Sequence, residues 1–310
     1  MWYAPRGVDY LLIALLTPLA LMYGGVMLLR RLAARKRRYD VPIISVGNLV
    51  VGGSGKTPAV IEIASRLDDV AVISRGYGRQ SRGLVEVSRR GKILCDVRQS
   101  GDEAMLMAVS LPHASVIVSE DRPLAVRKAI ADGARVIVLD DGFNRVDIDT
   151  FDILLEPSHL PNRLPFPAGP FREFAPIAAL ADVRLKEGRD FIRDVHIDSP
   201  ASRMVLVTSI ARPERLDAYL PKGVVHRYYL PDHAYFDKAE LEALLKRYNA
   251  ERLLVTQKDE VKLKPFGLPL SVMRLRLSFR TKIFDIIEQY LQNHKAGSYA
   301  AQNRSGQNAP

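Results

Sequence analysis

The residues best suited to chemistry lie in the segment Val46–Pro58, which reads VGNLVVGGSGKTP. An apolar run, Pro42–Val46, stops at glycines, and Gly-Lys-Thr then opens a segment that can form a helix. Glycines let backbone N–H groups turn toward a phosphate, and the helix start adds the positive end of its dipole. The segment therefore predicts a phosphate-binding loop. Val50 replaces the first glycine of the strict G-x-x-x-x-G-K-[ST] pattern, and a chance glycine-rich turn is the alternative.

Within this loop, each residue has an expected role. Lys56 would reach the β- and γ-phosphates of a nucleotide, and the Thr57 hydroxyl would ligate Mg²⁺. The predicted nucleotide-binding residues are Gly52, Gly53, Ser54, Gly55, Lys56 and Thr57.

A second set of candidate ligands, Asp140 and Asp141, ends the hydrophobic run that begins at Arg135. This is the Walker B form, in which an aspartate at the end of a strand holds Mg²⁺ directly or through water. Acids at strand ends also occur in ordinary loops, but a phosphate loop on an earlier strand of the same sheet favours metal binding. Thr57, Asp140 and Asp141 are thus the predicted metal ligands, and either aspartate could be the direct one.

Three further polar segments are ambiguous when taken alone. Asp102 and Glu103 stand at a probable helix start, where a carboxylate can simply be a favourable cap. The segment Ser74–Arg79 places arginines among glycines after a strand, which suits phosphate or sugar contacts but also a plain basic turn. His233 could be a general base or orient one, yet a lone histidine at a turn is more often a cap or a solvated side chain.

The elements that must position these residues alternate in type along the chain. Buried strands are expected at Ile43–Val46, Val70–Ser74, Ser115–Ser119, Val136–Asp140 and Phe151–Leu155, and helices at Thr57–Leu67, Asp102–Ser110 and Arg122–Asp132. A β-hairpin is expected over Leu84–Cys95, around Arg90-Gly91. Such alternation predicts an α/β fold with a mostly parallel, Rossmann-like sheet and ligands at the carboxyl ends of its strands.

The rest of the chain predicts a connector and a smaller α/β domain. Prolines make residues 157–176 an extended connector, and residues 295–310 have the composition of a disordered tail. Between them, strands are expected at Met204–Ser209, Val224–Tyr229 and Arg252–Thr256, with helices near Pro213–Tyr219 and Lys238–Tyr248. We therefore divide the chain into an anchor (1–38), a phosphate-loop domain (39–156), the connector (157–176), a second domain (177–294) and a tail (295–310).

The charge of the chain is concentrated beside an apolar segment. The 310 residues carry a formal charge of +10, and the stretch Arg30–Arg38 holds six basic residues and no acid. It follows Tyr10–Leu29, twenty residues without a charge, which as a helix would rise about 30 Å, enough to cross a bilayer core. The basic cluster favours a cytoplasmic body and contact with anionic lipid headgroups. A span, an interfacial helix and a buried core helix are the alternatives. The single cysteine, Cys95, favours a reducing compartment.

Together these motifs resemble those of the tetraacyldisaccharide 4′-kinase family, inner-membrane kinases of lipid A biosynthesis. The matching segments run in the family's order over most of the ordered chain. They are Pro18–Tyr23, Val46–Pro58, Ser74–Arg79, Gly101–Glu103, Asp140–Phe143, Pro167–Glu173, Asp232-His233 and Lys258-Asp259. The glycine-rich loop is common to many families, whereas its combination with Pro-Ala-Gly-Pro and Asp-Asp-Gly-Phe is much more specific.

The resemblance implies a P-loop kinase that uses ATP and Mg²⁺ to phosphorylate the 4′-hydroxyl of a tetraacyldisaccharide 1-phosphate at the cytoplasmic face of a bacterial inner membrane. It also implies that Asp102 is the catalytic carboxylate and His233 its partner across a cleft between domains. Substrate contacts are expected from Arg75, Tyr77, Arg79, Glu103, Arg172 and Glu173. The chain departs from the family's pattern at Asn144 and Arg145, and again at Gln257 and Glu260.

Two other functions compete with this interpretation. The segment Thr256–Asp259 is faintly similar to a guanine-reading motif, which would suit a membrane-associated GTPase, although Gln257 stands where that motif has lysine. A nucleotide-gated membrane scaffold is the non-enzymatic alternative. Nucleic-acid binding is disfavoured because the positive charge lies beside the apolar segment and no recognition motif accompanies it.

Overall fold

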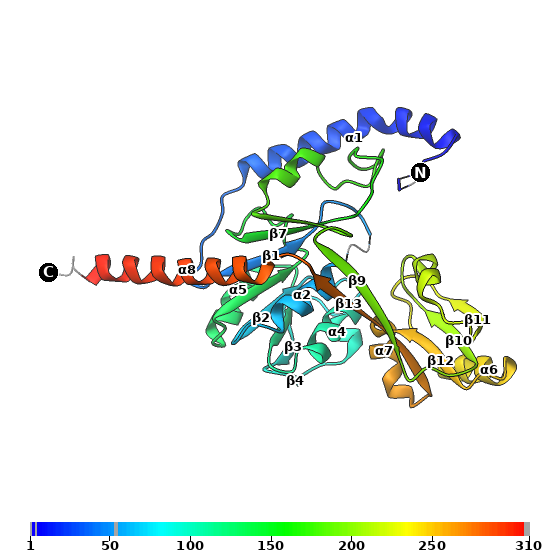
Figure 1. The fold of residues 1–310 in the computed structure, drawn as a ribbon. Helices are drawn as coiled ribbons and strands as arrows, with labels where there is room; N and C mark the ends of the chain where they lie inside the picture. Colours follow the sequence, from blue (N-terminus) through cyan, green and yellow to red (C-terminus); the bar gives the residue numbers. More distant parts are fainter. Residues whose placement is uncertain (1, 4, 53–54, 307–310) are drawn as a thin grey trace.

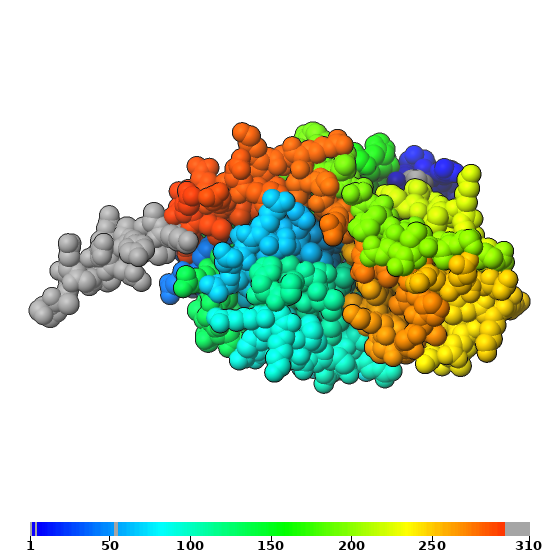
Figure 2. Space-filling view, turned by 60° about the horizontal axis from the view of Figure 1, so that its bottom comes forward, coloured from blue at the N-terminus to red at the C-terminus, as the bar shows by residue number. Residues whose placement is uncertain are grey.

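The structure is a computed structural model that describes residues 2–3, 5–52 and 55–306, with only the backbone described from residue 295 onward. It contains two sheets and a long N-terminal helix (Figure 1). The second domain packs directly against the first (Figure 2). The predicted α/β class is confirmed.

The first sheet has eight strands in the order β4-β3-β5-β2-β6-β1-β7-β8. Its strands are β1 (Ile43–Gly47), β2 (Val70–Ser74), β3 (Val85–Arg89), β4 (Lys92–Ile93), β5 (Ser115–Val118), β6 (Val136–Asp140), β7 (Phe151–Glu156) and β8 (Val183–Lys186). The six neighbouring strands β5-β2-β6-β1-β7-β8 are parallel to one another. At one edge of the sheet, β3 and β4 form the expected antiparallel hairpin, and β3 pairs antiparallel with β5. Strands β1, β2 and β6 are buried throughout, as the continuous apolar runs predict.

Helices cover both faces of this sheet because alternate strand residues point to opposite sides. The helices are α2 (Lys56–Ala64), α3 (Val97–Ser100), α4 (Asp102–Ser110) and α5 (Arg122–Ala131). Ile44 and Val72 point to the core beneath α2 and α4, whereas Ile43 and Ile73 point to the core beneath α5. Burying such a side chain fully stabilises the fold by about 1.5–3 kcal/mol.

The boundaries of the two domains differ from those expected at residues 156 and 177. Strand β8 pairs with β7 and so extends the first sheet to Lys186. The last helix, α8 (Ile283–Gly306), also returns to the first domain, where Ile283 and Ile287 join the core. Tyr290 stacks on Phe151 with ring centroids 4.6 Å apart. The helix continues through most of the segment expected to be a disordered tail, and alanines in that segment favour helix; residues 307–310 lie outside the described residues.

The second sheet has five strands in the order β11-β10-β12-β13-β9. Its elements are β9 (Phe191–Asp198), β10 (Met204–Thr208), β11 (Val224–Tyr229), β12 (Arg252–Thr256), β13 (Leu270–Phe279), α6 (Lys238–Arg247) and α7 (Gln257–Leu263). The helix expected near residue 213 is a 3₁₀ helix, η2 (Pro213–Tyr219); two others are η1 (Ala175–Leu180) and η3 (Lys264–Phe266).

A long antiparallel ribbon of β9 and β13 joins the two domains (Figure 1). At one end, Phe191 and Leu277 belong to the core of the first domain. Toward the other end, Ile197 and Met273 pack in the second. Because one ribbon is anchored in both cores, it fixes how the second domain faces the phosphate-loop domain.

The N-terminal helix, α1 (Val8–Ala33), is continuous through Pro18 and lies along the first domain (Figure 1). Its length and apolar composition would allow it to cross a membrane. Of its residues, only Ala20 and Gly24 are buried. Gly24 lies against the Phe174 ring, where an added Cβ would stand 2.6 Å from Cζ, so this close approach requires glycine. Most of the helix therefore presents apolar side chains outward.

Candidate functional site

The phosphate loop joins β1 to α2, as its sequence predicts. Gly52 and Gly55 have φ values of 102° and 85°, in the region that favours glycine. Lys56 is the first residue of α2, and its ammonium lies 3.3 Å from Asn48 Oδ1 and 3.7 Å from Asp141 Oδ1. Thr57 follows in the first turn. Gly53 and Ser54, also expected to bind nucleotide, lie outside the described residues.

Asp140 lies beside this loop because β6 is the direct neighbour of β1, with Val46 paired to Asp140. Its Oδ2 accepts a hydrogen bond of 3.1 Å from Ser74 Oγ, while its buried Oδ1 has no partner among the described residues. Burial, together with the charges of Glu103 and Asp141, raises the pKa of Asp140 to about 6. A buried carboxylate oxygen without a donor is suited to a cation.

Asp141 has the opposite electrostatic balance. Although burial favours its neutral form, Lys56 and Arg172 hold the pKa of Asp141 below its usual value. Arg172 Nη1 lies 2.7 Å from Asp141 Oδ2. The proline-rich connector brings Arg172 here because its backbone N–H donates to Leu49 O beside the phosphate loop. The connector thus places a cation beside the predicted phosphate loop.

The residues present fit a Mg²⁺ ion only together with other oxygen ligands. Among the described residues, no group of three or more His, Cys, Asp or Glu side chains could hold a metal by itself. Thr57 and the aspartate pair supply hydroxyl and carboxylate oxygens, the donors that Mg²⁺ prefers, and Mg²⁺ commonly takes its remaining ligands from substrate phosphates and water.

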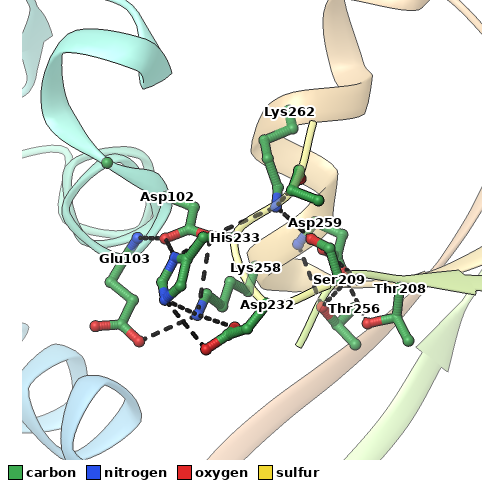
Figure 3. Close-up of polar contacts among 12 residues, drawn as sticks. Asp102, Glu103, Thr208, Ser209, Asp232, His233, Thr256, Lys258, Asp259 and Lys262 are labelled. Atoms are coloured by element: carbon green, nitrogen blue, oxygen red, sulfur yellow. Dashed lines mark hydrogen bonds and ion pairs between the residues drawn. The ribbon is translucent and has the colours of Figure 1, made fainter. Parts of the chain in front are cut away.

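Asp102 and His233 form a direct contact between the two domains (Figure 3). Asp102 is the first residue of α4, and its oxygens lie 2.9 and 3.0 Å from His233 Nδ1, 131 residues away. His233 follows β11 in a loop where its φ is 61°. Its ring meets the Tyr77 ring edge-on at 5.0 Å, and a Cβ on Gly78 would stand 2.9 Å from Nδ1, so the ring fits only against glycine.

Two lysines of α7 surround the same carboxylate (Figure 3). Lys258 Nζ lies 3.8 Å and Lys262 Nζ 3.5 Å from Asp102 Oδ2. Asp102 is only 4% exposed, and burial alone would raise its pKa, but His233 and the two lysines hold that pKa below its usual value. Asp102 is therefore an ionised carboxylate at neutral pH, as a general base must be.

Glu103 connects the two ends of the site. Its carboxylate lies 3.3 Å from Lys258 Nζ at the dyad, and its charge contributes to the raised pKa of Asp140 at the nucleotide end. The Asp102–His233 pair and the phosphate loop therefore face one region at the carboxyl edge of the first sheet.

The other predicted substrate contacts differ in their surroundings. Arg75 and Tyr77 are both exposed, and the Tyr77 ring lies against His233. Arg79, by contrast, is 3% exposed and donates to Gly83 O and Glu120 at 2.6 Å. Glu173 is bound by Arg31 of the basic cluster through two hydrogen bonds of 2.8 Å. Because both have strong partners within the protein, Arg79 and Glu173 hold the fold around the site in this structure.

Sequence reasoning missed four residues of this region. Asn48 contacts Lys56, and buried Arg122 donates to Asp140 O at 3.1 Å. Arg31 donates to the backbone of Phe143 in the aspartate loop. Lys262 carries a signal that could have been used: it lies four residues after Lys258, so both lysines occupy one face of a helix. Asn48 lies within the predicted phosphate loop, eight residues before Lys56, but the loop pattern assigns its position no side-chain role. No local pattern indicates Arg31 or Arg122, because their partners lie 112 and 18 residues away.

The chain matches known proteins over most of its length. The model of the tetraacyldisaccharide-1-phosphate 4′-kinase family matches residues 12–196 and 189–293. Relatives named tetraacyldisaccharide 4′-kinase include one from Helicobacter pylori, 46% identical over 295 residues and covering 94% of both chains. Another, from Aliarcobacter butzleri, is 42% identical over 302 residues, with 94% of this chain and 96% of the relative covered.

A solved structure agrees with the fold. The crystal structure of LpxK from Aquifex aeolicus, described in complex with ATP, superposes with a TM-score of 0.75 at 25% identity and covers 91% of this chain and 99% of its own. The predicted P-loop-like fold and the predicted kinase are thereby confirmed. The chain belongs to the tetraacyldisaccharide-1-phosphate 4′-kinase family.

Proposed function

We propose that this chain transfers the γ-phosphate of ATP to the 4′-hydroxyl of a tetraacylated glucosamine disaccharide 1-phosphate. The observation that carries this assignment is the Asp102–His233 contact, which pairs a buried, ionised carboxylate with a histidine of the second domain in a chain that also has a phosphate-binding loop. Phosphoryl transfer requires mainly positioning and neutralisation of charge, and the two ends of the site supply these separately.

At the nucleotide end, the backbone of the phosphate loop and Lys56 would bind the triphosphate. Thr57 and the Asp140–Asp141 pair would hold Mg²⁺, which when bound neutralises phosphate charge and orients the leaving diphosphate. Arg172, already beside Asp141, would stabilise the transferring group.

At the acceptor end, Asp102 would take the proton of the 4′-hydroxyl. As that O–H bond breaks, the oxygen attacks the γ-phosphorus, and the bond from the γ-phosphorus to the bridging oxygen breaks with its electron pair leaving on ADP. His233 would orient Asp102 through Nδ1. Tyr77 and Glu103 lie near this pair, and exposed Arg75 follows β2. All three would contact the sugar or its phosphate.

Because the proposed acceptor is a lipid, we expect helix α1 to hold the protein at the membrane. Along its length the helix contacts the first domain: Tyr23 packs on Phe166, Gly24 on Phe174, and Arg31 pairs with Glu173. A helix held side-on cannot stand upright in a bilayer without drawing polar parts of the domain into hydrocarbon. Its outward face exposes Leu11, Leu15, Leu19, Met22, Val26 and Leu29. We infer that α1 lies in the interface of the inner membrane, on the cytoplasmic side, beside anionic headgroups bound by the basic cluster.

Labelling of a single cysteine tests this orientation. Arg6→Cys in a Cys95→Ser background places a thiol before α1. An interfacial helix leaves it inaccessible to a membrane-impermeant maleimide added to intact spheroplasts and reactive after lysis. A spanning helix would make it reactive from outside, and Cys95→Ser alone is the control.

The structure argues against the GTPase alternative. Asp259, which would have to read guanine, is fully buried and accepts hydrogen bonds from Thr208 Oγ1 at 2.6 Å and Thr256 Oγ1 at 2.7 Å. Its carboxylate is therefore committed to the packing of α7 on β10 and β12.

Transfer of labelled phosphate tests the proposed activity. Purified protein, ATP labelled at the γ-position and tetraacyldisaccharide 1-phosphate should give a labelled lipid, with GTP a poorer donor and Lys56→Ala nearly inactive. Nucleotide hydrolysis that is independent of the lipid disaccharide, with no labelled lipid, would instead support a nucleotide-gated scaffold.

A further inference from the structure

Lys258 lies beside the His233 ring and is close to both members of the Asp102–His233 pair. Its Nζ lies 3.4 Å from His233 Nε2, and its side chain is 18% exposed (Figure 3). Three carboxylates surround this ammonium: Glu103 at 3.3 Å, Asp232 at 3.7 Å and Asp102 at 3.8 Å. Although burial lowers the pKa of Lys258, these acids raise it above its usual value. Lys258 therefore remains a cation.

A cationic ammonium determines where the imidazole can carry its proton. Lysine in this state has only donors, so Nε2 can form a hydrogen bond with it only as an acceptor. The proton of a neutral His233 then lies on Nδ1, which faces Asp102 at 2.9 Å and donates to it. Asp232 Oδ2 lies 3.5 Å from the same Nε2 and offers the acceptor that a protonated Nε2 would need. Lys258 and Asp232 thus favour opposite states of one nitrogen.

We propose that Lys258 is a positioning residue of this kinase, which holds His233 as the neutral Nδ1–H tautomer by donating to Nε2. In this state Asp102 keeps its charge, receives one hydrogen bond from the ring, and retains a lone pair for the acceptor hydroxyl. The proposal rests on the catalytic role proposed above for Asp102. Lys258 acts through His233 and need not touch the substrate.

Lys262, the second lysine near Asp102, has a structural role. Lys262 is 3% exposed and donates to Ser209 Oγ and to Ala234 O at 3.1 Å. It also lies 3.4 Å from Asp259, the buried carboxylate of its own helix. These contacts fasten α7 to the adjoining loops, and Lys262 supplies positive charge 3.5 Å from Asp102 Oδ2.

Removal of Lys258 should change the pH dependence of the reaction in a defined direction. Titratable groups surround Asp102 from four elements. They are Glu103 on α4, Lys258 and Lys262 on α7, Asp232, His233 and Tyr235 in the loop after β11, and Tyr77 in the turn after β2. Loss of one cation from this group makes proton uptake by the dyad easier. The ascending limb of the rate must therefore move to higher pH, with Lys262 still limiting the shift.

The first experiment compares pH–rate profiles for Lys258→Met, Lys258→Arg and wild type. We expect the ascending limb of kcat to rise by about one pH unit or more in Lys258→Met, the scale of a unit charge at this distance in a partly screened site. Lys258→Arg keeps the charge and the donor and should stay within a few tenths of a pH unit of wild type. Lys238→Met, an exposed lysine of α6 in the same domain, is the matched control.

Two outcomes of this experiment would overturn the proposal. One is a Lys258→Met variant whose kcat is lower at every pH but whose ascending limb stays at the same pH as in wild type. A purely structural role of Lys258 would give this result. The other is an equal shift in Lys258→Arg, which would mean that charge and donation at this position do not matter.

A second measurement does not depend on activity. In ¹⁵N-histidine spectra at neutral pH, with His233→Asn used to assign the signals, wild-type Nε2 should be unprotonated and Nδ1 protonated. In Lys258→Met, Nε2 should become protonated, with Asp232 as its acceptor. A protonated Nε2 in wild type would refute the proposal. A wild-type protein with the expected spectrum but no lipid phosphorylation would instead refute the proposed function, so the two failures are distinguishable.

Discussion

The two ends of the site differ in the charged groups that surround their buried carboxylates. At the nucleotide end, buried Asp140 has an oxygen with no partner among the described residues and a pKa raised to about 6. At the acceptor end, Asp102 is as deeply buried but is met by His233, Lys258 and Lys262, and its pKa is lowered. Burial is common to both carboxylates, so the neighbouring charges account for the difference: the acids Glu103 and Asp141 raise the pKa of Asp140, whereas His233 and two lysines lower that of Asp102.

This difference shows which part of the reaction the protein prepares in advance. The proposed base, Asp102, is charged and oriented by side chains of the protein, because the second domain brings His233, Lys258 and Lys262 to it. At the proposed nucleotide end, Asp141 is balanced by Lys56 and Arg172, whereas Asp140 is left for a cation that would enter with the phosphates. We therefore expect substitutions at the two ends to separate chemistry from nucleotide binding.

The largest effect is expected from Asp102→Asn, which keeps the shape of the side chain but removes the base. It should lower kcat by about 10²–10⁴, the usual scale for loss of a general base. ATP binding, measured with a fluorescent analogue, should stay within a few-fold of wild type because Asp102 belongs to the acceptor end. A parallel loss of nucleotide affinity would erase the proposed separation of the two ends.

A somewhat smaller effect on turnover, with a large effect on binding, is expected from Lys56→Met. Removing one cation from the phosphate loop should lower kcat/KM for ATP by about 10²–10³. It should also abolish the rise in melting temperature that wild type shows with MgATP, since only bound ligand stabilises the fold. Asp102→Asn is the matched control and should keep that rise. Equal thermal responses of the two variants to MgATP would contradict the assignment.

A buried carboxylate that belongs to neither end of the site, Asp152, shows what burial does to a carboxyl group. Asp152 on β7 is held mainly by burial at a raised pKa of about 6. Because the folded protein binds this proton more tightly than the unfolded chain, stability from this group falls as pH rises through that range. Asp152→Asn should therefore raise the free energy of unfolding by about 2–3 kcal/mol at pH 8 and hardly change it near pH 4. Denaturant titrations at the two pH values measure this, and an equal change at both would show that the carboxyl stays uncharged.

Much of the first domain could be predicted because its strands are continuous apolar runs. Strand β6 and helix α4 begin and end where the sequence places them, at residues 136–140 and 102–110. The ribbon of β9 and β13 was missed because neither strand is a continuous apolar run and each alternates polar and apolar residues over only part of its length. The C-terminal helix was missed as a part of the first domain, since nothing local indicates that Ile283 returns to a core built 200 residues earlier.

The site also contains residues that the sequence could predict and residues that it could not. Lys56, Thr57, Asp140 and Asp141 follow strands of one sheet, so topology alone brings them together. The pairing of Asp102 with His233 came only from family resemblance, because spacing cannot bring together residues in two domains. Lys262 and Arg122 act from positions that no motif marks.

The central claim is that Asp102 and His233 act as one unit across the two domains. The most direct test is single-turnover phosphoryl transfer in Asp102→Asn, His233→Asn and the double variant. Residues that act as a unit are non-additive. We predict that the double variant transfers phosphate about as slowly as the slower single variant. A double variant whose rate loss equals the product of the two single losses would contradict the account.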